Sequence, residues 1–189
     1  MNPIGHFKTI TEHKLLVMEH CFKMGIYRQG LTHDLSKYTP AEFLIGVKYY
    51  QGDRSPNNAE REEKGYSSAW LHHKGRNRHH FEYWIDYDIE HPGQTMGGMR
   101  MPRNYVAEML ADRIAASKVY NKGHYTQHDP LKYYMAGKSH YMIHPKTQKE
   151  LEFFLKILDR HGEEECFRFV REVYLKKGRK EDRKKGPHS

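Results

Sequence analysis

The stretch Gly30-Leu31-Thr32-His33-Asp34-Leu35-Ser36-Lys37-Tyr38 carries an imidazole and a carboxylate on adjacent residues, with a lysine three positions after the carboxylate. Adjacent side chains leave a helix about 100° apart, so His33 and Asp34 would not normally both face one neighbour. A divalent cation held between helices would give both side chains a reason to face inward. The stretch therefore predicts a metal site, provided that other segments supply further ligands.

Upstream of this stretch, the sequence predicts a helix with two histidines on its inward face. Within residues 10–29, His13, Val17, His20 and Met24 follow one another by steps of four, three and four, which places them on one helical stripe. Histidine makes up 15 of the 189 residues, and clustered histidines are a compositional indication of metal binding. Either His13 or His20 could reach a shared site.

Two pairs of histidines flank a glycine turn in the middle of the chain. The pattern predicts a helix that begins at Ser67 or Ser68 and ends with His72-His73. It also predicts a helix over residues 78–88, capped by Asn77, that begins with His79-His80. Two helix ends that meet at a glycine can direct several imidazoles at one point.

A carboxylate is expected from a further helix over residues 104–120, which Pro102 opens. Val106, Leu110 and Ile114 recur at helical spacing, and Asp112 lies among small apolar neighbours. A half-buried carboxylate needs a polar or charged partner. The next residue, Arg113, lies on another face of the helix, so the partner of Asp112 must come from elsewhere.

The segments between these sites predict helices and loops. Thr39-Pro40-Ala41-Glu42 has the pattern of a capping box with proline at the first helical position, which opens a helix to about Tyr50. A loop over residues 51–58 leads into a charged helix over 59–64, and residues 90–102, rich in glycine and proline, predict another loop. Alternation of period two is not evident. We therefore predict an all-α, single-domain helical bundle.

The C-terminal third predicts a helical hairpin with a structural role. One helix begins at Asp129-Pro130, and a longer one runs from His144-Pro145 to His161, where Gly162 ends it. The apolar faces of the long helix and of the helix after it are Leu151, Phe154, Leu155 and Leu158, and Cys166, Phe169, Val170 and Val173. Two such faces joined by a short turn should pack as an antiparallel hairpin.

Charge and composition set the remaining expectations. The net charge is +8, of which residues 176–189 contribute +5, so the domain over residues 1–175 carries +3. We expect residues 176–189 to form a disordered basic tail. This tail could contact nucleic acid through phosphates, although we favour a tail that is surrounded by solvent and binds no partner.

Cys21 and Cys166 form no CxxC pair and are expected to be reduced core thiols. A signal peptide and a membrane span are not evident, so we expect a cytoplasmic protein.

The candidate ligands follow a recognisable order. In chain order they are His13 or His20, His33-Asp34, His72 or His73, His79-His80 and Asp112. This order resembles that of the HD superfamily of metal-dependent phosphohydrolases, H…HD…D, which becomes H…HD…H…H…D in members that hold two metals. The segment His33-Asp34-Leu35-Ser36-Lys37 is similar to the superfamily's HD-x-x-K, and Ala111-Asp112-Arg113 resembles its last-ligand helix.

Two further likenesses extend the resemblance. His79-His80-Phe81-Glu82 is similar to the HH-x-E element of the two-metal cyclic-dinucleotide phosphodiesterases. Residues 13–120 also resemble a family of uncharacterised bacterial HD-like proteins with a Gly-Leu-x-His-Asp-Leu-Ser-Lys core and an Asn-x-His-His element. An HD-like bundle is therefore the fold that the resemblance implies for about two thirds of the chain, up to residue 120.

The resemblance implies a role for each candidate. The implied metal ligands are His13, His33, Asp34, His73, His79 and Asp112. Asp34 would bridge the ions if there are two, His20 is the alternative to His13, and His72 is the alternative to His73. His80 and Glu82 would serve as catalytic or supporting groups or as a third-ion position. Lys37 would contact a substrate phosphate. Apart from the resemblance, we expect the neighbouring arginines Arg76 and Arg78 to help hold that phosphate.

This mix of donors suits one or two divalent ions of iron, manganese, zinc, cobalt or nickel. The lack of cysteine near the candidate ligands argues against a structural zinc site. The first functional hypothesis is a metal-dependent phosphohydrolase acting on a nucleotide or another small phosphate ester, with metal-activated water as nucleophile and a protonated His80 assisting the leaving oxygen. The alternatives are a di-iron oxygenase and a non-catalytic, metal-stabilised module that binds nucleic acid through its basic tail.

Overall fold

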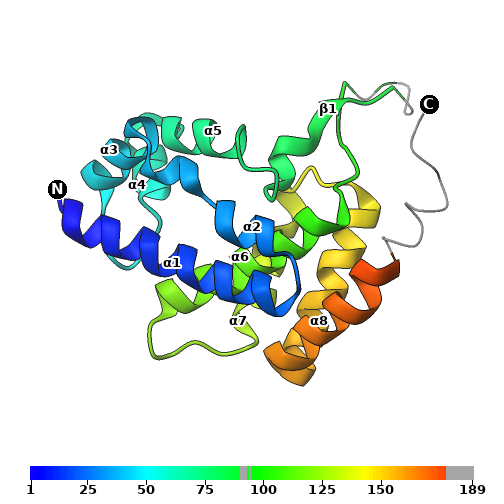
Figure 1. Cartoon of the computed structure of the whole chain (residues 1–189). Helices are drawn as coiled ribbons and strands as arrows, with labels where there is room; N and C mark the ends of the chain where they lie inside the picture. The colour runs from blue at the N-terminus through cyan, green and yellow to red at the C-terminus, as the bar shows by residue number, and fades with distance from the viewer. Residues whose placement is uncertain (90–92, 94, 178–189) are drawn as a thin grey trace.

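The computed structural model describes residues 1–89, 93 and 95–177, and α-helices dominate this part of the chain (Figure 1). The α-helices are α1 (Pro3–Lys23), α2 (Tyr27–Thr32), α3 (Pro40–Tyr49), α4 (Pro56–Lys64), α5 (Ser68–Lys74), α6 (Arg103–Asn121), α7 (Asp129–Gly137) and α8 (Pro145–Phe169). Shorter helical turns are η1 (Leu35–Tyr38), η2 (Phe81–Trp84), η3 (Lys138–His140) and the π-helical η4 (Val170–Leu175). The prediction of an all-α, single-domain bundle is confirmed.

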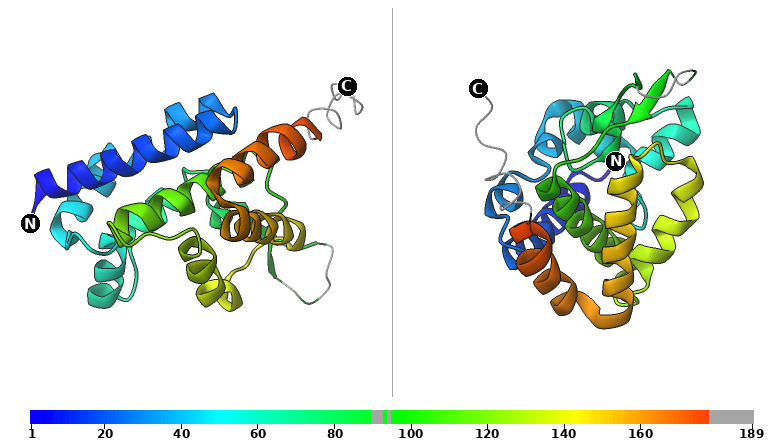
Figure 2. Two further views of the ribbon diagram at one scale, coloured as in Figure 1. Left: turned by 90° about the horizontal axis from the view of Figure 1, so that it is seen from below. Right: turned by 90° about the vertical axis from the view of Figure 1, so that its right-hand side faces the viewer.

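The long helices α1 and α6 pack along each other and form the centre of the molecule. In the left view of Figure 2, α6 lies in the middle: α1 and α2 lie on one side of it, and α7 lies on the other side. Val17 of α1, Met24 directly after α1, and Leu110 and Ile114 of α6 are completely buried. Each such side chain stabilises the fold by about 1.5–3 kcal/mol. The predicted inward stripe of α1 is thus confirmed, and it brings the histidines of α1 against α6.

The predicted helix over residues 10–29 is divided in two. Gly25, with φ +75°, ends α1, and α2 then turns back against it. A Cβ atom on Gly30 would lie 3.2 Å from the backbone of Met18 and 3.0 Å from Cβ of Cys21. Glycine at position 30 therefore lets α2 lie close to α1. This close packing returns residues 33–34 to the face of α1 that carries His13.

α3, α4 and α5 gather at the N-terminal end of α1 (Figure 1). A Cβ atom on Gly46 would lie 2.1 Å from Nε2 of His6, so α3 crosses α1 at this glycine. The ring of His6 is buried and also contacts Phe43 and Tyr50. Burial, together with the charge of Lys37, lowers the pKa of His6 to about 4. His6 is therefore a neutral core residue at pH 7.

The predicted helix over residues 78–88 is wrong, because the chain forms η2 and then a β-hairpin. β1 (Ile85–Tyr87) pairs antiparallel with β2 (Met96–Gly98), with Ile85 opposite Gly98. The amide of Asn77 does not cap a helix; it donates to Oγ of Ser36 and to the carbonyl of His73, both at 2.8 Å. Part of the predicted loop over 90–102 is thus β2, and residues 90–92 and 94 lie outside the described residues.

The predicted C-terminal hairpin is confirmed. Gly162, with φ +85°, interrupts α8, and the ring of Phe154 then contacts those of Phe169 and Tyr174. The predicted face of the final segment is shifted, since Val173 is 49% exposed whereas Tyr174 is buried. The π-helical geometry of η4 widens the turn and moves the inward position along the chain.

Most of the predicted basic tail lies beyond the described part of the chain. Lys176 and Lys177 continue the final helical segment, and residues 178–189 are outside the described residues. Among the described residues, no helix combines the length and apolar character needed to cross a membrane.

Candidate metal centre

The His33-Asp34 pair lies at a break between two helices. α2 ends at Thr32, His33 is extended with φ −54° and ψ 130°, and η1 begins at Leu35. Asp34 is left-handed, with φ 54°, and no other non-glycine residue in the described ranges adopts the left-handed conformation. Residues 33–37 therefore do not form one continuous helix. Because the helix is interrupted, both side chains can point inward despite being adjacent.

Neighbouring elements hold this break in place. Nζ of Lys14, on α1, donates to the carbonyl oxygens of Leu31 at 2.9 Å and of His33 at 2.8 Å. Aspartate tolerates the left-handed conformation better than most residues, but the conformation still costs about 1 kcal/mol. The backbone of Asp34 is therefore fixed by tertiary contacts against its local preference, which is common at functional sites.

The first set of donor atoms comes from α1, the helix break and α6. Nε2 of His13 lies 3.0 Å from Oδ1 of Asp112 and 3.4 Å from Nε2 of His33. Oδ2 of Asp34 lies 3.3 Å from Nε2 of His33 and 3.6 Å from Nε2 of His13. Four side chains from three separate segments of the chain thus present two nitrogens and two oxygens to one point.

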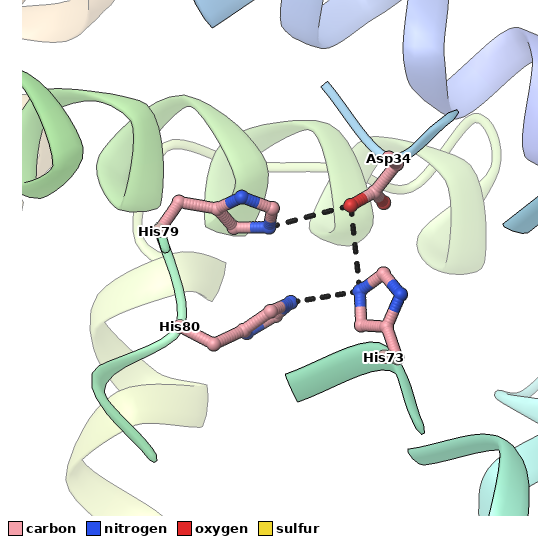
Figure 3. A group of neighbouring side chains, drawn as sticks. All are labelled: Asp34, His73, His79 and His80. Atoms are coloured by element: carbon pink, nitrogen blue, oxygen red, sulfur yellow. Dashed lines mark hydrogen bonds and ion pairs between the residues drawn. The ribbon is translucent and has the colours of Figure 1, made fainter. Parts of the chain in front are cut away.

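The second set comes from the helix break, the end of α5 and the turn before η2 (Figure 3). Oδ1 of Asp34 lies 3.3 Å from Nε2 of His73 and 3.4 Å from Nε2 of His79. Nε2 of His80 lies 2.9 Å from Nε2 of His73. Three imidazole nitrogens and one carboxylate oxygen therefore face one another.

The spacing of these atoms fits ligands of a metal ion. Ligands roughly 2.1 Å from one ion lie about 3.0 Å apart at the corners of an octahedron and about 3.4 Å apart at the corners of a tetrahedron. The donor distances given above lie between 2.9 and 3.6 Å, and within each set all donor atoms lie within 4.8 Å of one another. Both sets therefore have the size of a metal coordination shell.

Asp34 belongs to both sets, and each of its oxygens faces a different one. Oδ1 faces the imidazoles of His73 and His79, whereas Oδ2 faces those of His13 and His33. Oδ1 of Asp34 and Nε2 of His79 are buried, and neither forms a hydrogen bond with a described residue. Buried polar atoms without partners are costly, and a shared cation would satisfy both. Asp34 thus offers one carboxylate oxygen to each of the two candidate donor sets.

A buried carboxylate behind the first set orients two of the imidazoles. Oε1 of Glu108, on α6, accepts hydrogen bonds from Nδ1 of His33 at 2.9 Å and from Nδ1 of His79 at 3.2 Å. A carboxylate on Nδ1 fixes the tautomer and leaves Nε2 free for a metal, as is usual for histidine ligands. Glu108 lies on the same face of α6 as Asp112, one turn earlier.

A second carboxylate supports the other set. Glu42, on α3, accepts hydrogen bonds from Nδ1 of His73 at 2.8 Å and from Nδ1 of His72 at 2.6 Å. The predicted capping box is therefore wrong: Glu42 turns to the histidines, and the Thr39 hydroxyl donates to the Ser36 carbonyl. Proline at the first position of α3 is confirmed.

The carboxylates stay charged in spite of their burial. Burial alone would raise the pKa of Asp34 and of Asp112. The charges of His33 and Lys37 lower the pKa of Asp34 well below its usual value, and hydrogen bonds from His13 and His33 do the same for Asp112. Burial lowers the pKa of His80 well below its usual value, and His79 and His73 lower it further. Asp34, Asp112 and Glu108 raise the pKa of His33 well above its usual value, against the effect of burial. The centre therefore offers anionic oxygens and, at His80, a neutral imidazole to a cation.

Residues 2–157 match the model of a family of unknown function, DUF5662. The chain belongs to this family. The match spans both donor sets and the two supporting carboxylates. No curated protein and no solved structure matches the chain.

In this DUF5662 protein, the structure decides between the alternative histidines. His13 joins the first set, whereas Nε2 of His20 lies 3.2 Å from Nζ of Lys118. Burial and the charge of Lys118 lower the pKa of His20 to about 4. His73 is buried in the second set, and His72 is half-buried against Glu42. Of the predicted ligands, all six are brought together, and His80 joins them as a seventh donor.

The other predicted site residues of the DUF5662 chain lie around the centre. Nζ of Lys37 lies 2.6 Å from Oδ2 of Asp34, directly beside the first set. Glu82 belongs to neither set; burial raises the pKa of its carboxyl, and its Oε2 is buried without a hydrogen-bond partner among the described residues. Arg76 and Arg78 line a pocket that meets the centre at His79 and Glu108.

Glu42 and Glu108 were not among the sequence-based candidates. Glu108 alone carried a readable signal, because it lies four residues before Asp112 and so shares its face of α6; it is only 5% exposed. Glu42 lies next to the histidines only after α3 and α5 have packed, so its role depends on tertiary structure.

Proposed function

We propose that this DUF5662 protein is a metal-dependent phosphohydrolase that acts on a nucleotide or another small phosphate ester. The observation that carries the proposal is the position of Asp34 between two donor sets, with Lys37 beside one of them. A pair of divalent ions about 3.5–4 Å apart, when bound, would supply a water of lowered pKa and neutralise charge on a phosphoryl group.

The donor sets indicate which residues would hold the ions. His13, His33 and Asp112 would hold one ion with Oδ2 of Asp34. The second ion would be held through Oδ1 of Asp34 by His73, His79 and His80. Five imidazoles with two carboxylates favour iron, manganese, zinc, cobalt or nickel over magnesium and calcium, which prefer oxygen ligands.

Lys37 supplies the charge that would position a substrate. Its side chain is partly exposed, and Asp34 holds its ammonium beside the first set and raises its pKa against the effect of burial. A charged donor at this place can bind a phosphate oxygen while the phosphorus lies over the donor sets. His80 has a lowered pKa, so it fits a nitrogen ligand better than the protonated acid expected from the sequence.

The same nitrogen-rich donor set also suits a di-iron oxygenase, which is the second candidate. Phosphate release without oxygen separates the two reactions, because only hydrolysis proceeds under nitrogen. A non-catalytic module would show neither reaction and would use its metal for stability alone.

The test is a screen for phosphate release across nucleotides and phosphate esters, with protein loaded separately with iron, manganese, zinc, cobalt or nickel under nitrogen. We expect release with at least one metal and a return to background in Asp34→Asn. A matched control, Glu62→Gln, changes an exposed carboxylate on α4 and should leave the rate unchanged. Iron-dependent oxygen uptake without phosphate release would replace the hydrolase by the oxygenase. Metal-dependent stability with neither reaction would leave only the binding module.

A further inference from the structure

A pocket of about 360 Å³ lies behind the metal centre. Arg28 from α2 and Arg76 and Arg78 from the turn after α5 line it, together with uncharged side chains such as Asn104 and Tyr105 of α6. This volume falls within the range typical of small-molecule pockets. The pocket thus combines three guanidinium groups from two separate segments with amide and aromatic groups.

The pocket is separated from the donor atoms by two residues of the centre. His79 and Glu108 line it, and these two are joined through Nδ1 of His79. The ring nitrogen of His79 that faces Asp34 is Nε2, on the opposite side of the imidazole. A ligand in the pocket would therefore meet the rear of the centre and would not share the metal-facing side with a substrate.

The charge of the pocket is strongly positive. Glu108 is the single acidic residue that lines it, and its Oε1 is already engaged by His33 and His79. Arg28, Arg76 and Arg78 are exposed, so their guanidinium groups can turn toward a ligand. Guanidinium groups bind phosphate oxygens in a bidentate manner, and several together give high affinity for an anion with more than one phosphate.

We propose that this pocket is a second binding site, specific for a phosphorylated small molecule and distinct from the metal centre. The three arginines bind the phosphate groups, and the side chains of Asn104 and Tyr105 contact the rest of the ligand. Arg76 and Arg78 then serve this pocket instead of the substrate phosphate at the metals. The proposal does not depend on the reaction proposed above.

The test is isothermal titration of the full chain with pyrophosphate in the presence of a chelator, so that no metal contributes to binding. We expect saturable binding of one pyrophosphate per chain, at least tenfold weaker in the double variant Arg28→Ala/Arg78→Ala. Both arginines are exposed, so the variant should fold. Parallel titrations with inorganic phosphate and with ATP show whether the site recognises phosphate groups alone or a whole nucleotide.

Two controls decide where the anion binds. Arg54→Ala/Arg160→Ala removes the same number of charges from a partly exposed and an exposed arginine that do not line the pocket, and it should leave the affinity unchanged. Lys37→Ala should also leave it unchanged. An absence of saturable binding, an equal loss in Arg54→Ala/Arg160→Ala, or loss in Lys37→Ala but not in Arg28→Ala/Arg78→Ala would overturn the proposal.

Discussion

Oε1 of Glu108 lies 2.9 Å from Nδ1 of His33, and this contact joins two buried residues that are 75 positions apart in the chain. The carboxylate points at the imidazole nitrogen that turns away from the donor atoms. Because Glu108 engages Nδ1 of His33, Nε2 is the ring nitrogen of His33 that faces Asp34. The position of a residue that touches none of the expected ions therefore determines how a ligand is presented.

Glu108→Gln tests this relationship. The amide keeps the size of the side chain but loses the charge that fixes His33 and His79. We expect metal affinity to fall roughly 10–100-fold, as is typical for loss of a group that orients metal ligands. Competition with a fluorescent chelator measures the affinity, and circular dichroism checks the fold. Equal affinities for the variant and the wild type would show that Glu108 has no part in metal binding.

Asp34→Asn and Asp112→Asn should differ in metal content. Asparagine tolerates the left-handed conformation of residue 34, so the first change removes the bridging charge with little effect on the backbone. We expect two ions per chain in the wild type, one in Asp112→Asn and none in Asp34→Asn. Elemental analysis after gel filtration provides the counts. If the two variants retain the same number of ions, Asp34 does not serve both sets.

Lys37→Ala should separate substrate binding from metal binding. The lysine contacts Asp34, but its charge competes with a cation, so its loss should not lower the metal content. Loss of a charged hydrogen bond to phosphate costs about 1.5–3 kcal/mol, so we expect kcat/KM to fall roughly 10–100-fold. Steady-state kinetics on the substrate found by the phosphate-release screen, combined with elemental analysis, would check both parts. Loss of metal in this variant would contradict the assigned role.

Gly46→Ala should destabilise the fold at the crossing of α1 and α3. Alanine favours a helix by about 1 kcal/mol over glycine, but overpacking at a close contact costs about 1–3 kcal/mol. Because the new Cβ would lie 2.1 Å from Nε2 of His6, we expect a net loss in the free energy of unfolding, measured in urea. In a His6→Ala background the contact is gone, and the same change should be neutral or stabilising.

His6 should also make stability dependent on pH. Its folded pKa of about 4 lies below the ordinary value of 6.5, so the unfolded chain binds the proton more readily. The contribution of His6 is therefore fully present above pH 6.5, is lost as the pH falls from 6.5 to 4, and stays constant below pH 4. Urea unfolding of the wild type and of His6→Gln in a chelator should show a smaller decline for the variant. Parallel curves would mean that His6 titrates normally.

Helical periodicity was sufficient to predict the long elements. The inward stripe of α1, the helix around Asp112 and the hairpin of α8 all follow from regular apolar spacing, because burial of such faces determines the fold. The ordered list of ligands was also accessible, since donor residues remain recognisable whatever joins them. The fold class and six of the seven candidate metal donors could therefore be predicted from the sequence.

The failures have physical causes. The strands β1 and β2 are three residues each, and Met96-Gly97-Gly98 has no alternation that could reveal a strand. The left-handed backbone of Asp34 depends on tertiary contacts such as those of Lys14, which local preference cannot indicate. Glu42 matched a capping pattern, but hydrogen bonds to two imidazoles outweighed the cap.

The most direct test of a bridged pair of ions is the anomalous difference map of a crystal of the metal-loaded protein, measured at the absorption edge of the metal. The donor geometry predicts two peaks about 3.5–4 Å apart, one beside each carboxylate oxygen of Asp34. A map without peaks at Asp34, or with one peak that only the first or the second donor set contacts, would contradict a centre bridged by this residue.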